Sequence, residues 1–275
     1  MEIIVVVVSC LAALVTAQNR AGSTVAAEPL VIGETFTIAS AALKEVRRIN
    51  VYAPPGYAAS GKDRVPVLYM PDGGMAEDFL HVAGLVQIGV TNGTMRPFLL
   101  VGIENTERRR DMTGPTENED DRKIAPRVGG SAAFRRFVRH ELMPAVKARY
   151  RTTDESAIVG ESLAGLFVVE TFLLEPDLFD TYIAIDPSLW WNDGKLVAAA
   201  GEELRSRPLA KRRLHLASSG DAGLGDAIAR LTGLLEKGRF PGLTWHHDPL
   251  PEERHSTIYH PAALRAFRAL FRPEG

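Results

Sequence analysis

A tight turn from a strand into a helix is the feature that most constrains how this chain of 275 residues can fold. The apolar residues 157–159 run into Gly160-Glu161-Ser162-Leu163-Ala164-Gly165, and a helical pattern follows at once. Small residues before and after Ser162 let the backbone turn sharply and leave the hydroxyl exposed at the end of the strand. We therefore predict a nucleophile elbow with Ser162 as the nucleophile. Ala164 replaces the usual second glycine, and the alternative is a Gly/Ser turn without chemistry.

The composition fits one sizeable α/β domain with a full core, because 45% of the residues are hydrophobic and 24% are charged. The formal net charge is −2 at pH 7. A chain with so little net charge lacks the excess of positive charge that is typical of proteins that bind nucleic acid or an anionic membrane. We therefore expect a small-molecule substrate, and the oligomeric state stays open.

The N-terminus has the pattern of a secretory signal peptide. Residues 3–15 form an apolar run that is as long as a signal-peptide core and shorter than a membrane span. The small residues of Val15-Thr16-Ala17 predict cleavage after Ala17. We assign residues 1–17 to a signal peptide, 18–29 to a linker and 30–275 to a catalytic domain, and we expect a secreted or periplasmic protein.

Three alternatives stay open for this segment. Glu2, and no lysine or arginine, precedes the apolar run, so an uncleaved anchor is the first. The only cysteine, Cys10, follows Val7-Val8-Ser9 as in a lipoprotein site, although the apolar run continues beyond it. A buried N-terminal strand is the third. If the segment is removed, the mature chain has no cysteine and therefore no disulfide.

Apolar β-rich runs alternate with helical patterns along the rest of the chain, which predicts a mostly parallel sheet of eight strands with helices on both faces. The first two strands precede any helix, so we expect them to form an antiparallel edge. The predicted strands are residues 31–38, 47–53, 65–70, 98–103, 157–160, 181–185, 213–217 and 243–248.

Two further segments have a clear pattern. The spacing of apolar residues predicts a helix over residues 131–149, which Pro144 should kink or end. Residues 105–130 are rich in Arg, Asp, Glu, Gly and Pro, and a loop of this length in a compact domain is usually functional or mobile. Because it follows the carboxyl end of a strand, we expect it to cap the ligand pocket.

A serine nucleophile needs a base, which is commonly a histidine held by an acid. His255 lies between the last strand and the terminal helix, and this order suits α/β-hydrolases, in which the elbow serine comes first and the histidine last. The alternative is a solvated loop histidine. The other six histidines have structural explanations on helices, within strands or at a helix start: His81, His140, His215, His246, His247 and His260.

The acid is expected after the strand at residues 213–217. Asp221 is the first carboxylate there, and Asp226 is the alternative. Either residue has an ordinary explanation as a turn or cap, and Asp226 resembles the N-cap of a helix over residues 227–237.

Two backbone N–H groups are expected to stabilise an oxyanion. The residue after the nucleophile, Leu163, supplies one. The second comes from the loop after the third strand, Pro71-Asp72-Gly73-Gly74-Met75, where glycines allow the backbone to approach a ligand. We choose Gly74 as this donor and keep Gly73 as the alternative, while a plain Asp-Gly turn would need no such role.

These residues together resemble the putative-esterase branch of the α/β-hydrolases, which includes enterobactin-type siderophore esterases and esterase D. The likeness covers most of the chain after residue 40. The resemblance implies an α/β-hydrolase fold and a Ser–His hydrolase of esters or related acyl bonds, with Ser162 and His255 as nucleophile and base. Beside the elbow, it rests on Tyr69-Met70-Pro71-Asp72-Gly73-Gly74, Arg110-Asp111-Met112-Thr113 with Pro115, Glu141-Leu142-Met143-Pro144, Tyr150-Arg151-Thr152 and Pro187-Ser188-Leu189-Trp190-Trp191-Asn192-Asp193-Gly194.

The chain departs from this family at two positions. Glu161 occupies the place before the serine where the family usually has histidine, and a carboxylate there is expected to disfavour anionic substrates. Gly223 occupies the place where the family often has its acid. A Ser–His dyad, or an acid from Glu252 or Glu253, is therefore an alternative to Asp221.

Three side chains are candidates for substrate binding. Trp190 and Trp191 follow a strand end and are placed to line an acyl or aromatic pocket, although we expect at least one of them to pack against the protein. Arg110, in the run Arg108-Arg109-Arg110, is placed to bind a substrate carboxylate. The alternative is a solvated basic run paired with the acids at residues 117–121.

The sequence therefore predicts a serine hydrolase that cleaves carboxylic esters, of siderophore type by resemblance, through a covalent acyl-enzyme. Acyl transfer on the same residues is the first alternative, because the resemblance extends to mycolyl-transferring relatives. A binding protein that keeps the fold without catalysis is the second. No residue pattern calls for a metal or a cofactor.

Overall fold

The structure is a computed structural model that describes residues 27–57 and 61–273. Residues Ile32–Gly275 form one compact unit. The predicted signal peptide and most of the predicted linker lie outside the described residues. Within the described part of the chain, no helix is long and apolar enough to cross a membrane.

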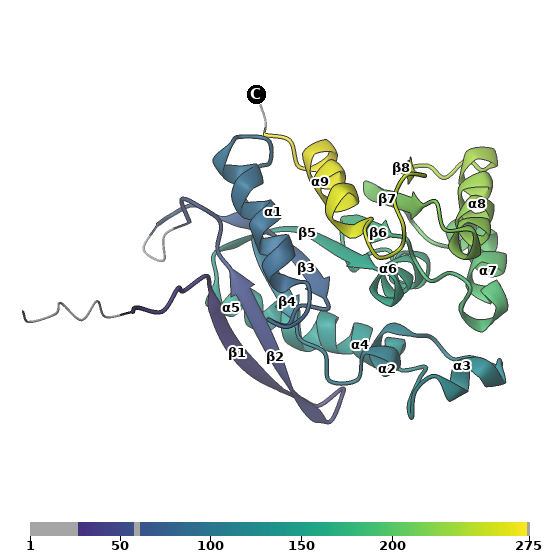
Figure 1. Cartoon of the computed structure of the whole chain (residues 1–275), viewed down its shortest axis with the longest axis horizontal. Coiled ribbons are helices and arrows are strands. Elements are labelled where there is room, and N and C mark those ends of the chain that lie inside the picture. Colours follow the sequence, from purple (N-terminus) through teal and green to yellow (C-terminus); the bar gives the residue numbers. More distant parts are fainter. Residues whose placement is uncertain (1–26, 58–60, 274–275) are drawn as a thin grey trace, which may run out of the picture. The chain divides into compact units, whose positions relative to one another are not determined.

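The core of the fold is an eight-stranded sheet with the order β1-β2-β4-β3-β5-β6-β7-β8 (Figure 1). β1 pairs antiparallel with β2, and β2 pairs antiparallel with β4, so the predicted antiparallel edge is confirmed. All pairs from β4 to β8 are parallel. The strands are β1 Glu34–Ser40, β2 Glu45–Tyr52, β3 Val65–Pro71, β4 Leu99–Ile103, β5 Thr152–Glu161, β6 Thr181–Ile185, β7 Arg212–Ser219 and β8 Leu243–Leu250.

Helices cover both faces of this sheet, as predicted. α1 and α9 lie together on one face, and α4, α5 and α6 lie on the other (Figure 1). The helices are α1 Phe79–Thr91, α2 Arg108–Met112, α3 Glu119–Lys123, α4 Ser131–Phe137, α5 Met143–Arg149, α6 Leu163–Leu174, α7 Lys195–Ser206, α8 Ala222–Lys237 and α9 Tyr259–Leu270, with a π-helix η1 Val138–Leu142 and a 3₁₀-helix η2 Trp191–Gly194.

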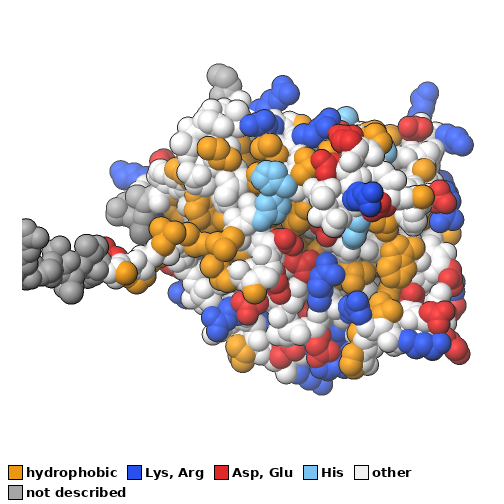
Figure 2. Space-filling model, in the orientation of Figure 1, with side chains coloured by type: hydrophobic (Ala, Val, Ile, Leu, Met, Phe, Trp, Pro, Cys, Tyr) orange, Lys and Arg blue, Asp and Glu red, His pale blue; other side chains and the backbone are white. Residues whose placement is uncertain are grey.

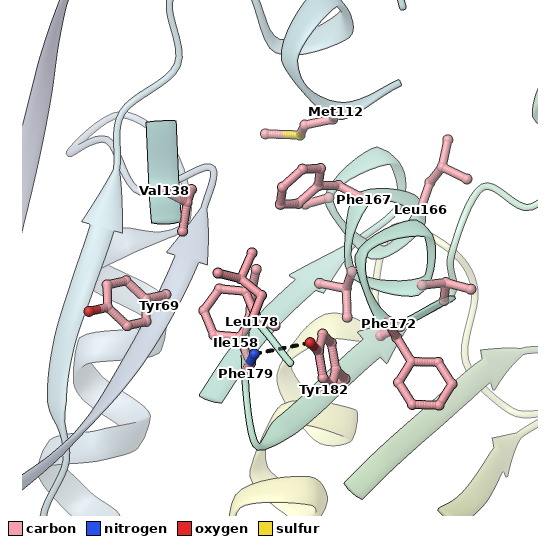
Figure 3. Packing of buried hydrophobic residues seen from close by; sticks show 14 of the residues in the cluster. Tyr69, Met112, Val138, Ile158, Leu166, Phe167, Phe172, Leu178, Phe179 and Tyr182 are labelled. Atoms are coloured by element: carbon pink, nitrogen blue, oxygen red, sulfur yellow. Dashed lines mark hydrogen bonds between the residues drawn. The ribbon is translucent and has the colours of Figure 1, made fainter. Parts of the chain in front are cut away.

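The helix that follows the serine, α6, is buried along almost its whole length. Figure 3 shows Phe167 and Phe172 from α6 among the apolar residues that pack against the sheet. The Tyr182 hydroxyl is hydrogen-bonded inside this core, where it accepts from the Phe179 N–H at 3.0 Å (Figure 3). A helix that is apolar on all sides must be enclosed, so the elbow rests on a fixed support.

The predicted helix over residues 131–149 is present but irregular. It consists of α4, η1 and α5, and Pro144 lies at the first turn of α5. Proline has no N–H and its ring crowds the preceding turn, which a wider π-turn relieves. Proline therefore widens the helix at this point without ending it.

The segment 105–130 is not a plain loop, because it contains the short helices α2 and α3. Asn118 caps α3 by accepting hydrogen bonds from the N–H groups of Asp120 and Asp121. The Asn192 N–H donates to the Asp121 carboxylate at 2.8 Å, which ties the segment to the loop after β6.

Charged side chains of both signs are interspersed on the face shown in Figure 2, in keeping with the small net charge. Arg47 and Asp111 form a fully buried ion pair. Arg47 on β2 and Asp111 in α2 are 0% exposed, and Nη1 lies 2.5 Å from Oδ2. The Arg47 guanidinium also lies over the Phe134 ring, 5.3 Å from its centroid. This pair joins the edge of the sheet to the segment 105–130.

Removing the acid of this pair should be costly, because it leaves a buried guanidinium without its main counter-charge. We expect Asp111→Ala to lower the free energy of unfolding by about 3–5 kcal/mol, as measured by urea denaturation. Asp154→Ala is the control, since it removes an exposed carboxylate that pairs with Lys147, and it should leave the midpoint almost unchanged. Equal effects of the two substitutions would contradict this role for the buried pair.

Candidate active site

The carboxyl ends of the parallel strands bring the candidate residues together. Ser162 follows β5, and Asp186 follows β6, its neighbour in the sheet. His255 lies between β8 and α9. In a parallel sheet all these ends meet at the same edge, which is where ligands bind in open α/β sheets.

The turn at Ser162 has the strained backbone of a nucleophile elbow. Its φ is 60° and its ψ is −120°, which L-residues rarely adopt. Gly160 makes the turn possible, because a Cβ there would lie 2.7 Å from the backbone carbonyl of Ala164. Two backbone bonds fix the turn to the end of β6: the Ser162 N–H donates to the Ile185 carbonyl at 3.1 Å, and the Ser188 N–H donates to the Ser162 carbonyl at 3.0 Å.

A hydrogen-bonded chain links serine, histidine and aspartate. His255 Nε2 lies 3.0 Å from Ser162 Oγ, and His255 Nδ1 lies 2.7 Å from Asp186 Oδ2. With Nδ1 protonated toward the carboxylate, Nε2 can accept the serine proton. We call these three residues the triad.

The charges within the triad stabilise each other. Burial, which leaves the Asp186 side chain 1% exposed, opposes its ionisation more than any other single cause, but hydrogen bonds from His255 and Ser219 together outweigh it and lower the pKa of Asp186. The hydrogen bond from His255 to Asp186 is the main reason that the pKa of His255 is raised, although burial opposes it. Asp186 is therefore ionised at neutral pH and favours the imidazolium form of His255.

The expectation that Asp221 orients the imidazole is not met. Asp221 Oδ2 accepts a hydrogen bond from the backbone N–H of His255 at 2.8 Å, while Asp186 is bound to the ring. Asp221 thus fixes the loop that carries the histidine. Asp226 does not cap a helix at residue 227, because α8 already begins at Ala222 and Asp226 lies within it.

The sequence contained a signal for Asp186. It is the first residue after a fully buried strand that neighbours the elbow strand, and it directly precedes the Pro187-Ser188 motif. Chain order and the family resemblance both favour an acid after β7, so they do not identify Asp186. The φ of Asp186 is 44°, in the left-handed region that residues other than glycine rarely adopt.

The two glycine candidates for an oxyanion hole differ in their partners. The Gly73 N–H donates to the Ile103 carbonyl at 3.0 Å, which fixes it to β4. The Gly74 N–H donates to the Glu77 carboxylate at 2.6 Å. The Glu77 side chain can rotate away from the Gly74 N–H, whereas the strand β4 cannot move away from the Gly73 N–H. Gly74 is therefore the better candidate for the oxyanion donor. Leu163 is the first residue of α6, and its N–H has no acceptor within the helix.

The tryptophans separate into one buried and one exposed side chain. Trp191 is 4% exposed, and its Nε1 donates to the Gly114 carbonyl at 2.9 Å. It packs against the segment 105–130, so it does not line a pocket. Trp190 is 41% exposed and stays available to a ligand.

Arg110 pairs its charge with two acids of the chain itself. Its guanidinium donates to Glu45 at 2.7 and 3.0 Å and to Asp111 at 2.7 Å. The hydrogen bond with Glu45 is the main cause that raises the pKa of Arg110. The partners of Arg110 are therefore Glu45 and Asp111, in place of the expected acids at residues 117–121, and its role in substrate binding stays a prediction.

Among the residues that the structure describes, no group of three or more His, Cys, Asp or Glu side chains is placed to hold a metal ion.

Sequence comparison places these residues in a family. The model of the family described as "Putative esterase" matches residues 40–224, which include Ser162 and Asp186. The chain belongs to the putative esterase family. His255 lies beyond the matched region.

Two curated relatives and one solved structure show the range of this likeness. The ferri-bacillibactin esterase BesA of Bacillus subtilis is 38% identical over 114 residues, which cover 39% of this chain and 37% of that protein. The siderophore triacetylfusarinine C esterase of Aspergillus fumigatus is 32% identical over 154 residues, 48% of this chain and 47% of that protein. The matched regions thus span less than half the length of either relative.

The structural likeness covers more of the chain. An IroE-like serine hydrolase from Shewanella oneidensis has a TM-score of 0.76 and 29% sequence identity, and the match covers 87% of this chain and 80% of that one. The eight-stranded sheet and its helices therefore form an α/β-hydrolase fold, as the sequence predicted.

The hydrogen bond between Asp186 and His255 has a direct spectroscopic test. We expect Asp186→Asn to lower the pKa of His255, because it removes the largest cause of its increase. A smaller decrease is expected for Asp221→Asn, since that carboxylate acts on the ring only through its charge. The measurement is an NMR pH titration of the imidazole signals, with His255→Gln to identify the signal. A larger decrease in Asp221→Asn would restore Asp221 as the acid.

Proposed function

We propose that this protein is a serine hydrolase that cleaves carboxylic esters of small molecules. The observation that carries the proposal is the 3.0 Å contact between His255 Nε2 and the hydroxyl of Ser162 at a strained elbow. A structural serine in a turn needs neither the unusual backbone nor the histidine. Membership of the putative esterase family supports the same conclusion.

In the first half of the reaction, the Ser162 oxygen attacks the ester carbonyl while Nε2 of His255 takes the serine proton. Asp186 stabilises the imidazolium that forms. The tetrahedral intermediate collapses when its bond to the leaving alcohol breaks, and the imidazolium returns the proton to that oxygen. A covalent acyl-serine remains.

Water completes the cycle. His255 takes a proton from water as the hydroxide attacks the acyl carbonyl, and it then returns this proton to the Ser162 oxygen. The acid product leaves and the free serine is restored. Asp186 stays ionised throughout, because its hydrogen bonds stabilise the carboxylate.

The oxyanion is stabilised by the N–H groups of Leu163 and Gly74. The Gly74 donor becomes available when the Glu77 carboxylate turns away from it. One such donor contributes about 3–4 kcal/mol to the stability of the transition state in other acyl-transfer enzymes. The exposed face of Trp190 provides an apolar wall for the substrate.

The substrate class that we propose is a siderophore-type ester. This follows from the names of the curated relatives, which are siderophore esterases. The apolar residues 3–15 and the small residues before Gln18 support export from the cytoplasm, to the periplasm or the medium.

Loss of the nucleophile should abolish turnover. We expect Ser162→Ala to lower the rate of p-nitrophenyl butyrate hydrolysis by about 10³-fold or more and to prevent labelling by a fluorophosphonate probe. Ser188→Ala is the matched control, because its Oγ lies 3.4 Å from that of Ser162 but outside the chain of proton transfer. Hydrolysis that survives in Ser162→Ala would remove the serine from the mechanism.

The two aspartates should differ in their kinetic effects. We expect Asp186→Asn to lower kcat by about 10²–10⁴-fold with little change in KM, because the missing charge acts when the imidazolium forms. Asp221→Asn should cost about tenfold or less, since it only loosens the histidine loop. Steady-state kinetics on p-nitrophenyl butyrate measure both effects. A greater loss in Asp221→Asn would show that the observed pairing is not the catalytic one.

A further inference from the structure

Glu161 lies directly beside the reacting atoms. It is the last residue of β5, and its side chain is 16% exposed. Its Oε1 lies 3.3 Å from His255 Nε2, the same nitrogen that contacts Ser162. Any substrate carbonyl that reaches Ser162 must therefore approach this carboxyl group.

The groups around Glu161 carry more negative than positive charge. The pKa of Glu161 is affected by the charges of three nearby residues, Asp72 after β3, Asp78 before α1 and Arg108 in α2. The single guanidinium in this group is engaged by Asp72, through two hydrogen bonds of 2.7 and 2.8 Å. From α9, Tyr259 borders the same group and is uncharged, because burial raises the pKa of its hydroxyl.

The ionisation of Glu161 changes near neutral pH. Burial is the largest cause and raises the pKa of Glu161 to about 7, although His255 and Arg108 oppose this increase. Burial also raises the pKa of Asp78. Glu161 is therefore mostly neutral at pH 6 and mostly ionised at pH 8.5.

We propose that Glu161 is a specificity-determining residue that selects uncharged or cationic esters and excludes esters with a negative charge close to the scissile carbonyl. The inference rests on the proposed role of Ser162 as nucleophile. When an ester carries a negative charge several ångströms from the ionised Glu161, repulsion at the dielectric of a partly buried site lowers the affinity for that ester about tenfold. By charge alone, a ferric complex of three hydroxamates, which is neutral, suits this site better than one of three catecholates, which is triply anionic.

A matched pair of esters tests this proposal. p-Nitrophenyl butyrate and mono-p-nitrophenyl succinate have the same leaving group and chain length, but the succinate ends in a carboxylate. We expect the ratio of kcat/KM for butyrate over succinate at pH 8.5 to fall about tenfold in Glu161→Gln, which keeps the shape and removes the charge.

Asp154→Asn is the matched control, because it removes one exposed negative charge at the opposite end of the same strand. It should leave the ratio unchanged. An unchanged ratio in Glu161→Gln, with butyrate still hydrolysed, would overturn this inference and leave the proposed function intact. Failure of the natural protein to hydrolyse butyrate would overturn the proposed function itself.

The natural protein provides a second measurement that needs no variant at residue 161. The ratio should rise as the pH increases from 6 to 8.5, because Glu161 becomes ionised while the succinate carboxylate stays ionised throughout. Protonation of His255 affects both esters equally and cancels from the ratio. A ratio that stays constant across this range would overturn the proposal.

Discussion

The strained backbone at Ser162 is the constraint on which the rest of the site depends. A residue in such a conformation costs about 1–3 kcal/mol, so the surrounding structure must hold it. Two backbone hydrogen bonds to Ile185 and Ser188 do this. Because Asp186 lies between those two residues, the bonds that hold Ser162, the proposed nucleophile, also fix Asp186, the proposed acid. The distance between Ser162 and Asp186 is thus set by the neighbouring strands β5 and β6. Backbone hydrogen bonds between strands fix such a distance more rigidly than a contact between side chains does.

The histidine is placed by a different part of the sheet. Its loop is tied to the end of β7 by two bonds, from the Gly220 N–H to the Glu253 carbonyl and from the His255 N–H to Asp221. The Asp221 carboxylate therefore fixes the backbone of the loop, while Asp186 orients the imidazole ring of His255. Two carboxylates thus position His255, since Asp186 after β6 contacts its ring and Asp221 after β7 accepts from its backbone N–H.

The sequence predicted the sheet well, because parallel buried strands are continuous apolar runs and the elbow has a local pattern in Gly160 and Ser162. Asp186 and Arg110 could not be assigned in the same way. The position of Asp186 directly after a buried strand marks it as one candidate acid. Which of the candidate carboxylates reaches His255 depends on strand order, however, and no local pattern encodes that order. The partner of Arg110, Glu45, is 65 residues away along the chain and lies on the antiparallel edge. Contacts of this kind depend on the topology of the fold, so they can be identified from the structure but not from a local sequence pattern.

The imidazole of His255 lies between two carboxylates, Asp186 at Nδ1 and Glu161 near Nε2. Both favour the imidazolium, and both contribute to the raised pKa of His255. A more basic imidazole accepts the serine proton more readily, but a larger fraction of it is already protonated at neutral pH. The two carboxylates are not equivalent in this balance. Hydrogen bonds lower the pKa of Asp186, so it stays ionised at neutral pH, whereas burial raises the pKa of Glu161 to about 7. Glu161 therefore favours the imidazolium less as the pH falls below about 7 and its carboxylate becomes protonated.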